Sequence, residues 1–250
     1  NNKHIEFDCM WSSSLTDSAV KGKPDNQSVD YSSRILSLND TMDVTTKPVI
    51  FDGDNGGRIE HLGYLVRSLE RSGVSAVAIE DKIGLKKNSL FKNQKGVKQD
   101  NPIKFSKKIK KIVESRSSKD FMVIARIESF ILGKGLNDAL KRAEIYSKAG
   151  ADAILIHSKN KKPNEIFSFA KKFNLTKYKL PLVAVPSSYS TVKEKDLIDN
   201  GFKVVIYANQ LLRAAFPAMQ NVAKNILKNT RSHEIEKKIV PINEIINLVK

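Results

Sequence analysis

The sequence has very little cysteine and no long apolar run. Among its 250 residues Cys9 is the one cysteine, so no disulfide can form within the chain, and we expect a reducing, cytoplasmic setting. No uninterrupted apolar stretch approaches the roughly 20 residues of a membrane-spanning helix, so we expect no membrane partner. Hydrophobic residues still make up 40% of the chain, which is enough for an ordinary globular core.

Sequence motifs for nucleotides and nucleic acids are absent as well. The chain contains no G-x-G-x-x-G pattern and no P-loop, the turns that bind phosphate groups in open nucleotide-binding sheets. It also lacks zinc-finger spacing and an RNP-type aromatic motif. These absences argue against the common nucleotide-binding and nucleic-acid-binding classes.

Positive charge is the most biased feature of the composition. A net charge of +16 raises binding to nucleic acid as a hypothesis. The lysines, however, come in small groups such as residues 107–111 and 159–162, interleaved with apolar positions of expected helices. We expect most of them on solvated helix faces, with the remainder attracting anionic substrates, and no nucleic-acid partner. A non-catalytic basic nucleic-acid-binding module is the alternative from a different functional class.

Short apolar segments alternate with helical segments along the chain. We expect strands at residues 5–11, 48–51, 76–79, 121–125, 153–156, 182–185 and 203–207. One intervening helix has Ile59, Leu62, Val66 and Leu69 at helical spacing and ends at Gly73, where a left-handed cap is needed. Strand–helix alternation of this kind predicts parallel strands joined by crossover helices.

The residues at the strand ends favour a closed barrel over an open sheet. Polar residues end five of the segments: Asp52, Glu80, Arg126, His157 and Asn209. In a (β/α)8 barrel all such ends meet at one mouth. Such a barrel needs about eight strands and seven are found, and the chain starts with Asn1 instead of Met. We therefore expect one barrel domain over residues 1–250, N-terminally truncated so that the first strand is missing.

The stretch "VIFDGDNGG", residues 49–57, places two carboxylates in a glycine-rich turn after a strand. Asp52 and Asp54, joined by Glu80 at the next strand end, are hard oxygen ligands that suit Mg2+. Glycines in this turn let the backbone approach a ligand closely. A helix N-cap is the plain alternative. A calcium loop does not fit, because its twelfth position would be Gly63 instead of Glu.

A second informative stretch is "IEDKIGLKKNS", residues 79–89. Its basic, polar, glycine-containing second half is typical of a mobile loop that closes over an anionic substrate, although Lys86 and Lys87 taken singly also fit a solvated surface loop. Arg126 offers a fork for phosphate or carboxylate, and His157 ends the next expected strand. The residues alone therefore predict a magnesium-centred anion pocket in a barrel mouth.

Six segments carry a resemblance to a known family. They read "WSSSLTDSAVKGKPD", "FDGDNGG", "EDKIGLKKNSL", "IARIES", "GADAILIHSK" and "VVIYANQLLRAA". In this order, over nearly the whole chain, they resemble the phosphoenolpyruvate mutase branch of the isocitrate lyase/phosphoenolpyruvate mutase superfamily. From the residues alone we expect helices at residues 211–227 and 242–249, with apolar faces that pack on a neighbouring subunit. The resemblance implies a (β/α)8 barrel whose last helix is exchanged between subunits of a homodimer or homotetramer. It also implies Mg2+-dependent interconversion of phosphoenolpyruvate and 3-phosphonopyruvate, the carbon–phosphorus bond-forming step of phosphonate biosynthesis.

The resemblance also implies roles for individual residues. Asp52 would bind the metal directly, while Asp54, Glu80 and Asp25 would hold its water ligands. Asp25 would in addition be the catalytic aspartate beside the migrating phosphoryl group. The groups that hold the pyruvyl carboxylate and enolate oxygen would be Trp11, Ser13, Ser14 and Leu15. The groups that bind the phosphoryl would be Arg126, His157, Asn88 and Ser89. The residues of the gating loop would be Lys86, Asn88 and Leu90.

Two relatives on the same scaffold are alternatives to a mutase. In phosphonopyruvate hydrolase the gating-loop asparagine is replaced by threonine, so Asn88 favours the mutase. The carbon–carbon lyases carry a catalytic cysteine in this loop, whereas here Cys9 lies elsewhere. Ser14 stands where the family often has glycine, so the turn beside the enolate is expected to differ slightly in backbone.

Overall fold

The structure is a computed structural model that describes residues 5–248. The chain forms two compact units, Asn1–Ala208 and Asn209–Lys250. The first is an α/β unit that carries the predicted site residues. The second is helical.

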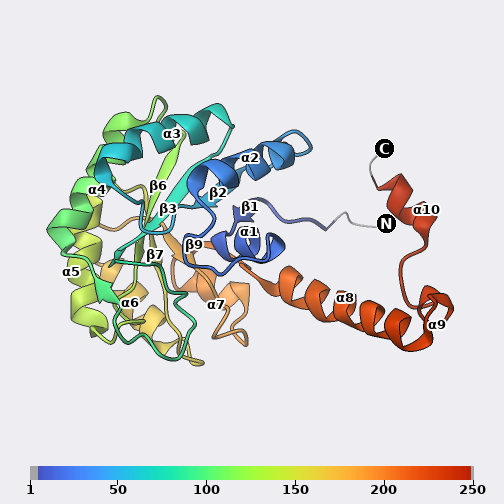
Figure 1. The fold of residues 1–250 in the computed structure, drawn as a ribbon. Coiled ribbons are helices and arrows are strands. Elements are labelled where there is room, and N and C mark those ends of the chain that lie inside the picture. The colour runs from blue at the N-terminus through green and yellow to red at the C-terminus, as the bar shows by residue number, and fades with distance from the viewer. Residues whose placement is uncertain (1–4, 249–250) are drawn as a thin grey trace. The chain divides into compact units, whose positions relative to one another are not determined.

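Seven parallel strands form the sheet of the first unit (Figure 1). They are β1 (Met10–Ser12), β2 (Val49–Asp52), β3 (Ala76–Glu80), β6 (Met122–Ile127), β7 (Ala153–Ile156), β8 (Leu182–Ala184) and β9 (Phe202–Val205). They follow one another in this order, every neighbouring pair is parallel, and the sheet curls into a half-barrel. Six of the seven expected strands are confirmed within two residues at each end, whereas the first, expected at residues 5–11, is shorter and lies at Met10–Ser12. No ladder joins β1 to β9 within residues 5–248, so these residues do not close the sheet.

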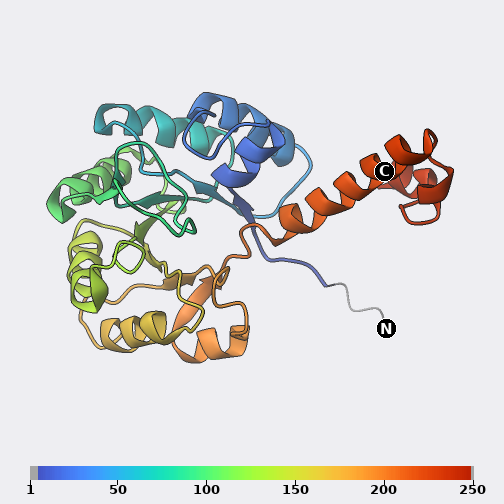
Figure 2. The same ribbon diagram turned by 60° about the horizontal axis from the view of Figure 1, so that its bottom comes forward.

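Helices follow the strands and ring the outside of the curled sheet (Figure 2). They are α1 (Ser14–Val20), α2 (Tyr31–Met42), the short 3-10 helix η1 (Ile59–His61), α3 (Leu62–Arg71), α4 (Pro102–Ser115), α5 (Gly135–Lys148), α6 (Asn164–Phe173) and α7 (Glu194–Asp199). Helix α3 stops before Gly73, whose φ of +79° is the expected left-handed cap. Two short antiparallel strands, β4 (Lys82–Ile83) and β5 (Lys98–Gln99), form a separate ladder between β3 and α4.

Successive side chains along each strand point to opposite faces of the sheet, which produces two apolar layers. On β2, Val49 and Phe51 pack in the layer between sheet and helices, while Ile50 packs in the smaller inner layer. On β3, Val77 belongs to the outer layer and Ala78 to the inner one. Both faces of the strands are thus buried, which is why their sequences read as continuous apolar runs.

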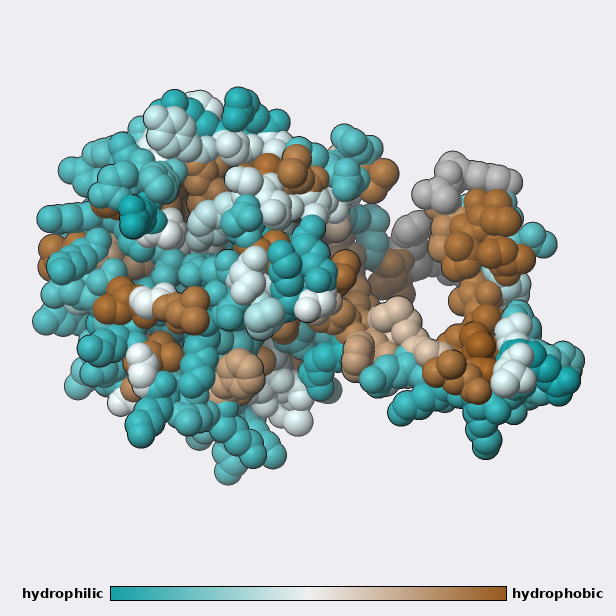
Figure 3. Space-filling model, viewed as in Figure 1, coloured by the Kyte–Doolittle hydropathy of each residue, from teal (hydrophilic) through white to brown (hydrophobic). Residues whose placement is uncertain are grey.

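The second unit contains α8 (Gln210–Asn229), α9 (His233–Glu236) and α10 (Ile242–Asn247). The helix expected over residues 211–227 is confirmed. The end of the segment expected at 242–249 lies outside the described residues. Apolar side chains are exposed along these helices and form the brown patches on the C-terminal segment in Figure 3. Among residues 5–248, none of the helices has the length and apolar character needed to cross a bilayer.

Candidate active site

The turn after β2 is shaped by its close approach to β3. The Gly53 amide donates to the Ala78 carbonyl (2.7 Å), and a Cβ at position 53 would lie 2.9 Å from the Val77 side chain. Only glycine fits there without a shift of its neighbours. Asp54 follows with a φ of +48°, a conformation uncommon outside glycine, and its carbonyl accepts from the Glu80 amide (2.6 Å). The turn therefore holds Asp54 beside Glu80.

Asp52 ends β2 as a buried, ionised carboxylate. Its Oδ2 accepts from the Ser14 hydroxyl (2.7 Å), and its Oδ1 accepts from the Asp54 amide (3.2 Å). Burial alone would raise the pKa of Asp52. The positive charges of Lys86 and Arg34 outweigh burial and hold the pKa well below its usual range.

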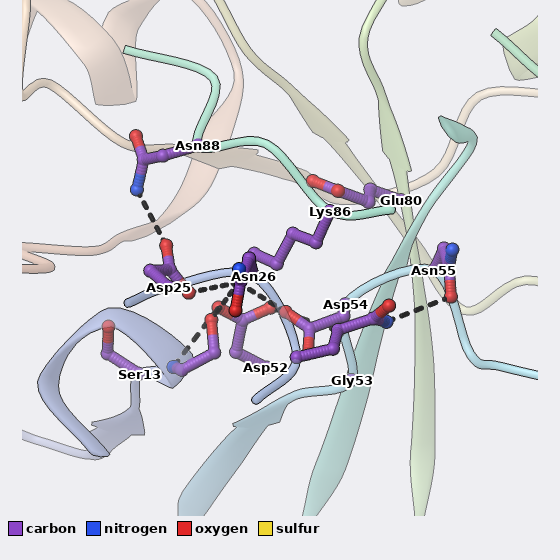
Figure 4. Close-up of polar contacts among 12 residues, drawn as sticks. Ser13, Asp25, Asn26, Asp52, Gly53, Asp54, Asn55, Glu80, Lys86 and Asn88 are labelled. Atoms are coloured by element: carbon purple, nitrogen blue, oxygen red, sulfur yellow. Dashed lines mark hydrogen bonds and ion pairs between the residues drawn. The ribbon is translucent and has the colours of Figure 1, made fainter. Parts of the chain in front are cut away.

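Lys86 reaches from the loop between β4 and β5 into a group of carboxylates (Figure 4). Its Nζ pairs with Asp25 Oδ1 (2.8 Å) and contacts both Asp54 Oδ1 and the Ser14 hydroxyl. Burial opposes the charged form of Lys86, but the surrounding carboxylates raise its pKa above the ordinary value. Asn88 follows on the same loop and donates to Asp25 Oδ2 (2.9 Å). The loop thus lies over the acids in a closed position.

The oxygen donors in this group fit a magnesium ion. Asp54 Oδ1 is buried, accepts no hydrogen bond of regular geometry, and has only an ion pair with Lys86 among the contacts described. Burial and the neighbouring charge of Asp52 raise the pKa of Asp54, although Lys86 and Arg34 lower it in part, so added positive charge here would favour the ionised pair. No three His, Cys, Asp or Glu side chains of residues 5–248 are arranged to bind a metal directly. Mg2+ usually keeps several waters, so one direct carboxylate with others holding its waters suits this arrangement.

A second group of charges lies at the ends of β3, β6 and β7. Strand register places Glu80 opposite Arg126, whose Nη2 is 3.4 Å from Glu80 Oε2. Arg126 Nε also donates to Glu128 Oε1 (2.6 Å), and Glu128 is fully buried. Burial raises the pKa of Glu80 to about 7, even though Arg126 and Lys82 lower it in part. Burial would raise the pKa of Glu128 too, but there Arg126 and Lys82 prevail and hold it well below its ordinary value.

His157 is a neutral member of this second group. Its Nδ1 lies 2.9 Å from Arg126 Nη2 and 3.3 Å from Glu128 Oε1. Burial and the charge of Arg126 lower the pKa of His157 below 6.5, so the imidazole is neutral at pH 7. Because the guanidinium of Arg126 can only donate, we assign Nδ1 as the acceptor, which leaves a proton on Nε2.

Ser89 links the closing loop to this second group. Its hydroxyl donates to Glu128 Oε2 (2.5 Å) and accepts from Arg126 Nη2 (2.8 Å). Lys86, Asn88 and Ser89 thus span both groups within four consecutive residues. Ten of the fourteen predicted site residues come together in these two groups: Ser14, Asp25, Asp52, Asp54, Glu80, Lys86, Asn88, Ser89, Arg126 and His157.

The other four predicted residues have local roles in the structure. Ser13 caps α1, and its hydroxyl accepts from the Thr16 amide (3.4 Å). Trp11 is half-buried on β1 and packs against the inner apolar layer. Leu15 is half-buried in the first turn of α1, and Leu90 is 38% exposed on the loop. Their predicted substrate contacts remain predictions.

Three buried charged residues of the site were not predicted: Arg34, Lys82 and Glu128. Glu128 and Lys82 lie in the motifs "IARIES" and "EDKIGLKKNSL", each two residues after a predicted site residue. Both could have been predicted from their spacing, because residues two apart in an extended segment point to the same side, so a charged residue two positions after a strand-end charge is expected beside it. Arg34 stands in α2 without any motif, and nothing local in the sequence marks it.

Arg34 joins three elements beneath the acids. Its guanidinium donates to Asp17 Oδ2 (2.7 Å), to the Asp52 carbonyl (2.5 Å) and to the Ser12 carbonyl (3.2 Å). It also lies 4.1 Å from the centre of the Phe51 ring. This arginine therefore fixes the ends of β1 and β2 and brings a positive charge under the carboxylates.

Comparison with known proteins identifies relatives that match nearly the whole chain. The family described as phosphoenolpyruvate phosphomutase matches residues 2–227. The phosphoenolpyruvate phosphomutase of Tetrahymena pyriformis is 38% identical over 97% of this chain and 80% of its own length. The crystal structure of the phosphoenolpyruvate phosphomutase from Streptomyces platensis subsp. rosaceus superposes with a TM-score of 0.91 at 36% identity, covering 97% of this chain and 83% of that chain.

A relative with a different reaction is almost as similar. The structure of a phosphonopyruvate hydrolase in complex with oxalate and Mg2+ superposes with a TM-score of 0.86 at 33% identity. The match covers 97% of this chain and 82% of the hydrolase. The extent of these matches and the shared fold lead to one conclusion: the chain belongs to the phosphoenolpyruvate phosphomutase family.

Proposed function

We propose that the chain is a Mg2+-dependent phosphoenolpyruvate mutase that interconverts phosphoenolpyruvate and 3-phosphonopyruvate. In one direction the C3–P bond of phosphonopyruvate breaks and a bond forms between phosphorus and the C2 enolate oxygen. No proton is gained or lost overall. The observation that carries the proposal is the closing loop, which contacts the acid group through Lys86 and Asn88 and the Arg126 group through Ser89.

The closing loop matters because phosphoryl transfer depends on positioning and charge stabilisation more than on covalent help. Arg126 supplies a fixed positive fork, and the Nε2 proton of neutral His157 is a donor for a phosphoryl oxygen. Asn88 and Lys86 hold the Asp25 carboxylate beside the loop. A closed loop also keeps out water, which would otherwise accept the phosphoryl group.

The carboxylates are proposed to hold the metal. Asp52 would bind Mg2+ directly, and Asp54, Glu80 and Asp25 would hold its water ligands. When bound, the ion would stabilise the negative charge of the enolate. Support comes from the oxygen donor set, from the buried Asp54 Oδ1, whose contact is the ion pair with Lys86, and from the Mg2+ named for the hydrolase relative.

The test is 31P NMR of the purified chain with phosphonopyruvate, with and without Mg2+. We expect phosphoenolpyruvate to appear only when Mg2+ is present. Appearance of inorganic phosphate in its place would reject the mutase and support the second candidate, phosphonopyruvate hydrolase. The similarity to that hydrolase is the observation in its favour. Asn88 is our reason for placing the mutase first.

Three broader expectations accompany this proposal. We propose that the enzyme acts in phosphonate biosynthesis in the cytoplasm, as one barrel domain. We also propose a homodimer or homotetramer in which the C-terminal helix is exchanged between subunits. The exposed apolar side chains of α8, which include Phe216 and Met219, support an oligomer.

A further inference from the structure

Lys82 is a buried lysine at the base of the closing loop. It lies on β4 and is 4% exposed. Its Nζ donates to the Lys87 carbonyl (2.8 Å) and to the Ser89 hydroxyl (2.8 Å). These two acceptors flank Asn88, which in turn donates to Asp25. One buried ammonium therefore holds the loop on both sides of the residue that covers the acids.

The same ammonium is part of a balanced set of charges. Lys82 Nζ lies 3.2 Å from Glu80 Oε1 and 3.5 Å from Glu128 Oε2. Arg126 contacts the other oxygens of these two carboxylates, Glu80 Oε2 at 3.4 Å and Glu128 Oε1 at 2.6 Å. Two cations thus alternate with two carboxylates, the arrangement that makes buried charge tolerable.

The Ser89 hydroxyl completes this arrangement only while the loop is closed. It accepts from Lys82 and Arg126 and donates to Glu128, so both of its lone pairs and its proton are in use. If the loop opened, all three hydrogen bonds and the one to the Lys87 carbonyl would break together. Charge-assisted hydrogen bonds are stronger than neutral ones, so the free-energy cost of breaking them on opening strongly favours the closed state.

We propose that Lys82 is a positioning residue that keeps the loop closed during transfer and so determines whether the phosphoryl group goes to the enolate or to water. This inference rests on the proposed mutase function. Without Lys82, residues 87–89 would lose their buried donor and Asn88 would leave Asp25 more often. Water could then attack phosphorus as the C–P bond breaks, giving phosphate, while the pyruvate enolate takes up the proton that water releases.

The first test is Lys82→Met, which removes the ammonium and keeps a long side chain. In 31P NMR with phosphonopyruvate we expect the ratio of phosphate to phosphoenolpyruvate to rise about tenfold, a change equivalent to about 1.4 kcal/mol. The matched control is Lys92→Met, since Lys92 is an exposed residue of the same loop. It loses the same charge and should keep the wild-type ratio.

A second variant guards against simple loss of folding. Lys82→Met leaves Glu80 and Glu128 short of one positive charge, whereas Lys82→Met combined with Glu128→Gln removes one charge of each sign. We expect this double variant to fold, as checked by urea unfolding, and also to produce more phosphate relative to phosphoenolpyruvate. A folded variant of either kind with the wild-type product ratio would overturn the proposal.

Loop opening can be measured without the reaction. Chymotrypsin should cleave after Phe91, which is 59% exposed on the loop, and about tenfold faster in Lys82→Met than in the wild type. Lys92→Met should be cleaved at the wild-type rate. Equal rates in all three proteins would reject the role of Lys82 in loop closure. If the wild type formed neither product, the proposed function would fail, and this measurement would still decide for or against Lys82.

Discussion

Individual charges in this site are stabilised by neighbours that come from other elements. Lys86 is surrounded by Asp25, Asp52 and Asp54, and each of these acids would be costly to bury without a cation. Lys86 belongs to the loop, so a change in the charge of the acids also changes the strength of the ion pairs that keep the loop closed. Metal binding and loop position are therefore expected to be coupled through this one side chain.

Replacing Asp52 by Asn tests the metal assignment. Mg2+ should raise the melting temperature of the wild type, because a ligand that binds only the folded state at 100 times its Kd stabilises by about 2.7 kcal/mol. The Asp52→Asn variant should lose most of that rise, as measured by differential scanning calorimetry. Asp43→Asn, at an exposed position, serves as the control and should keep it. Equal rises in all three proteins would place the ion elsewhere.

His157 should make the folded state sensitive to acid. Its pKa is lowered on folding by burial and by Arg126, so the unfolded chain takes up a proton more readily near pH 6.5. The stability that comes from keeping His157 neutral is present above pH 6.5 and is lost as the pH falls below that value.

Urea unfolding between pH 7.5 and pH 5 measures this effect. The free energy of unfolding should fall less toward pH 5 in His157→Gln than in the wild type. The exposed His61 provides the control, since His61→Gln should follow the wild-type curve. If His157→Gln lost stability toward acid as steeply as the wild type, His157 would not be the group responsible.

At the scale of elements, α2 and the closing loop both bring side chains to the acids of the site. Helix α2 brings Arg34 to the carboxylates, where it joins β1, β2 and α1. The loop brings Lys86 and Asn88 to Asp25. The strands contribute fixed backbone and the acids themselves. Stability is therefore expected to depend on α2, and reaction outcome on the loop.

Replacing Arg34 by Leu should destabilise the fold. Removing one partner of a buried ion pair costs about 3–5 kcal/mol, because the other charge is left uncompensated. Arg34→Leu should therefore unfold at clearly lower urea concentration, and adding Asp17→Asn should restore part of the loss. Arg58→Leu is the control, because Arg58 is exposed. If Arg34→Leu lowered the free energy of unfolding no more than the control does, Arg34 would not be important for holding α2, β1, β2 and α1 together.

Replacing Asn88 by Thr should shift the products toward hydrolysis. Threonine lacks the amide donor that now reaches Asp25 Oδ2 (2.9 Å), a hydrogen bond to a charged group worth about 1.5–3 kcal/mol. We expect the ratio of phosphate to phosphoenolpyruvate, read by 31P NMR, to rise about tenfold or more. Asn93→Thr, at an exposed loop position, should leave the ratio unchanged. An unchanged ratio in Asn88→Thr would remove the reason for preferring a mutase over a hydrolase.

At the scale of the whole molecule, net charge and apolar surface have separate consequences. The charge of +16 favours encounter with anionic substrates such as the proposed phosphonopyruvate, and that contribution should weaken as salt is added. The exposed apolar residues of the C-terminal helices do not attract substrate, and their contact with water is unfavourable. Leu211, Phe216, Met219 and Leu227 of α8 are each more than half exposed, which favours a partner subunit.

Charges placed on α8 should break this association. We expect the wild type to sediment as a dimer or tetramer, and a variant with both Phe216→Glu and Met219→Glu to sediment as a monomer at the same concentration. Burying two carboxylates in an apolar interface is costly, which is the reason for the shift. Lys228→Glu, on an exposed position of the same helix, is the control and should stay associated. A wild type that is monomeric at high concentration would contradict the prediction.

The sequence by itself determined the strands and the residues at their ends. Continuous apolar runs bounded by Asp52, Glu80 and His157 were sufficient, because burial on both faces and the ends of parallel strands leave a local pattern. The two glycine-flanked acids were also visible locally. The structure confirms the strands, the first of them shorter than expected, and brings these strand ends to one site.

Only the tertiary structure decided which charges meet. Lys86 and Asp25 are 61 residues apart, and Ser89 and Glu128 are 39 apart. Arg34 has no local motif, and its role exists only because α2 packs beneath β1 and β2. Burial in a low-dielectric interior turns these distant pairs into strong interactions, and neither burial nor pairing can be read from a single segment. The sequence therefore supplied the chemical groups, and the fold decided how they are paired.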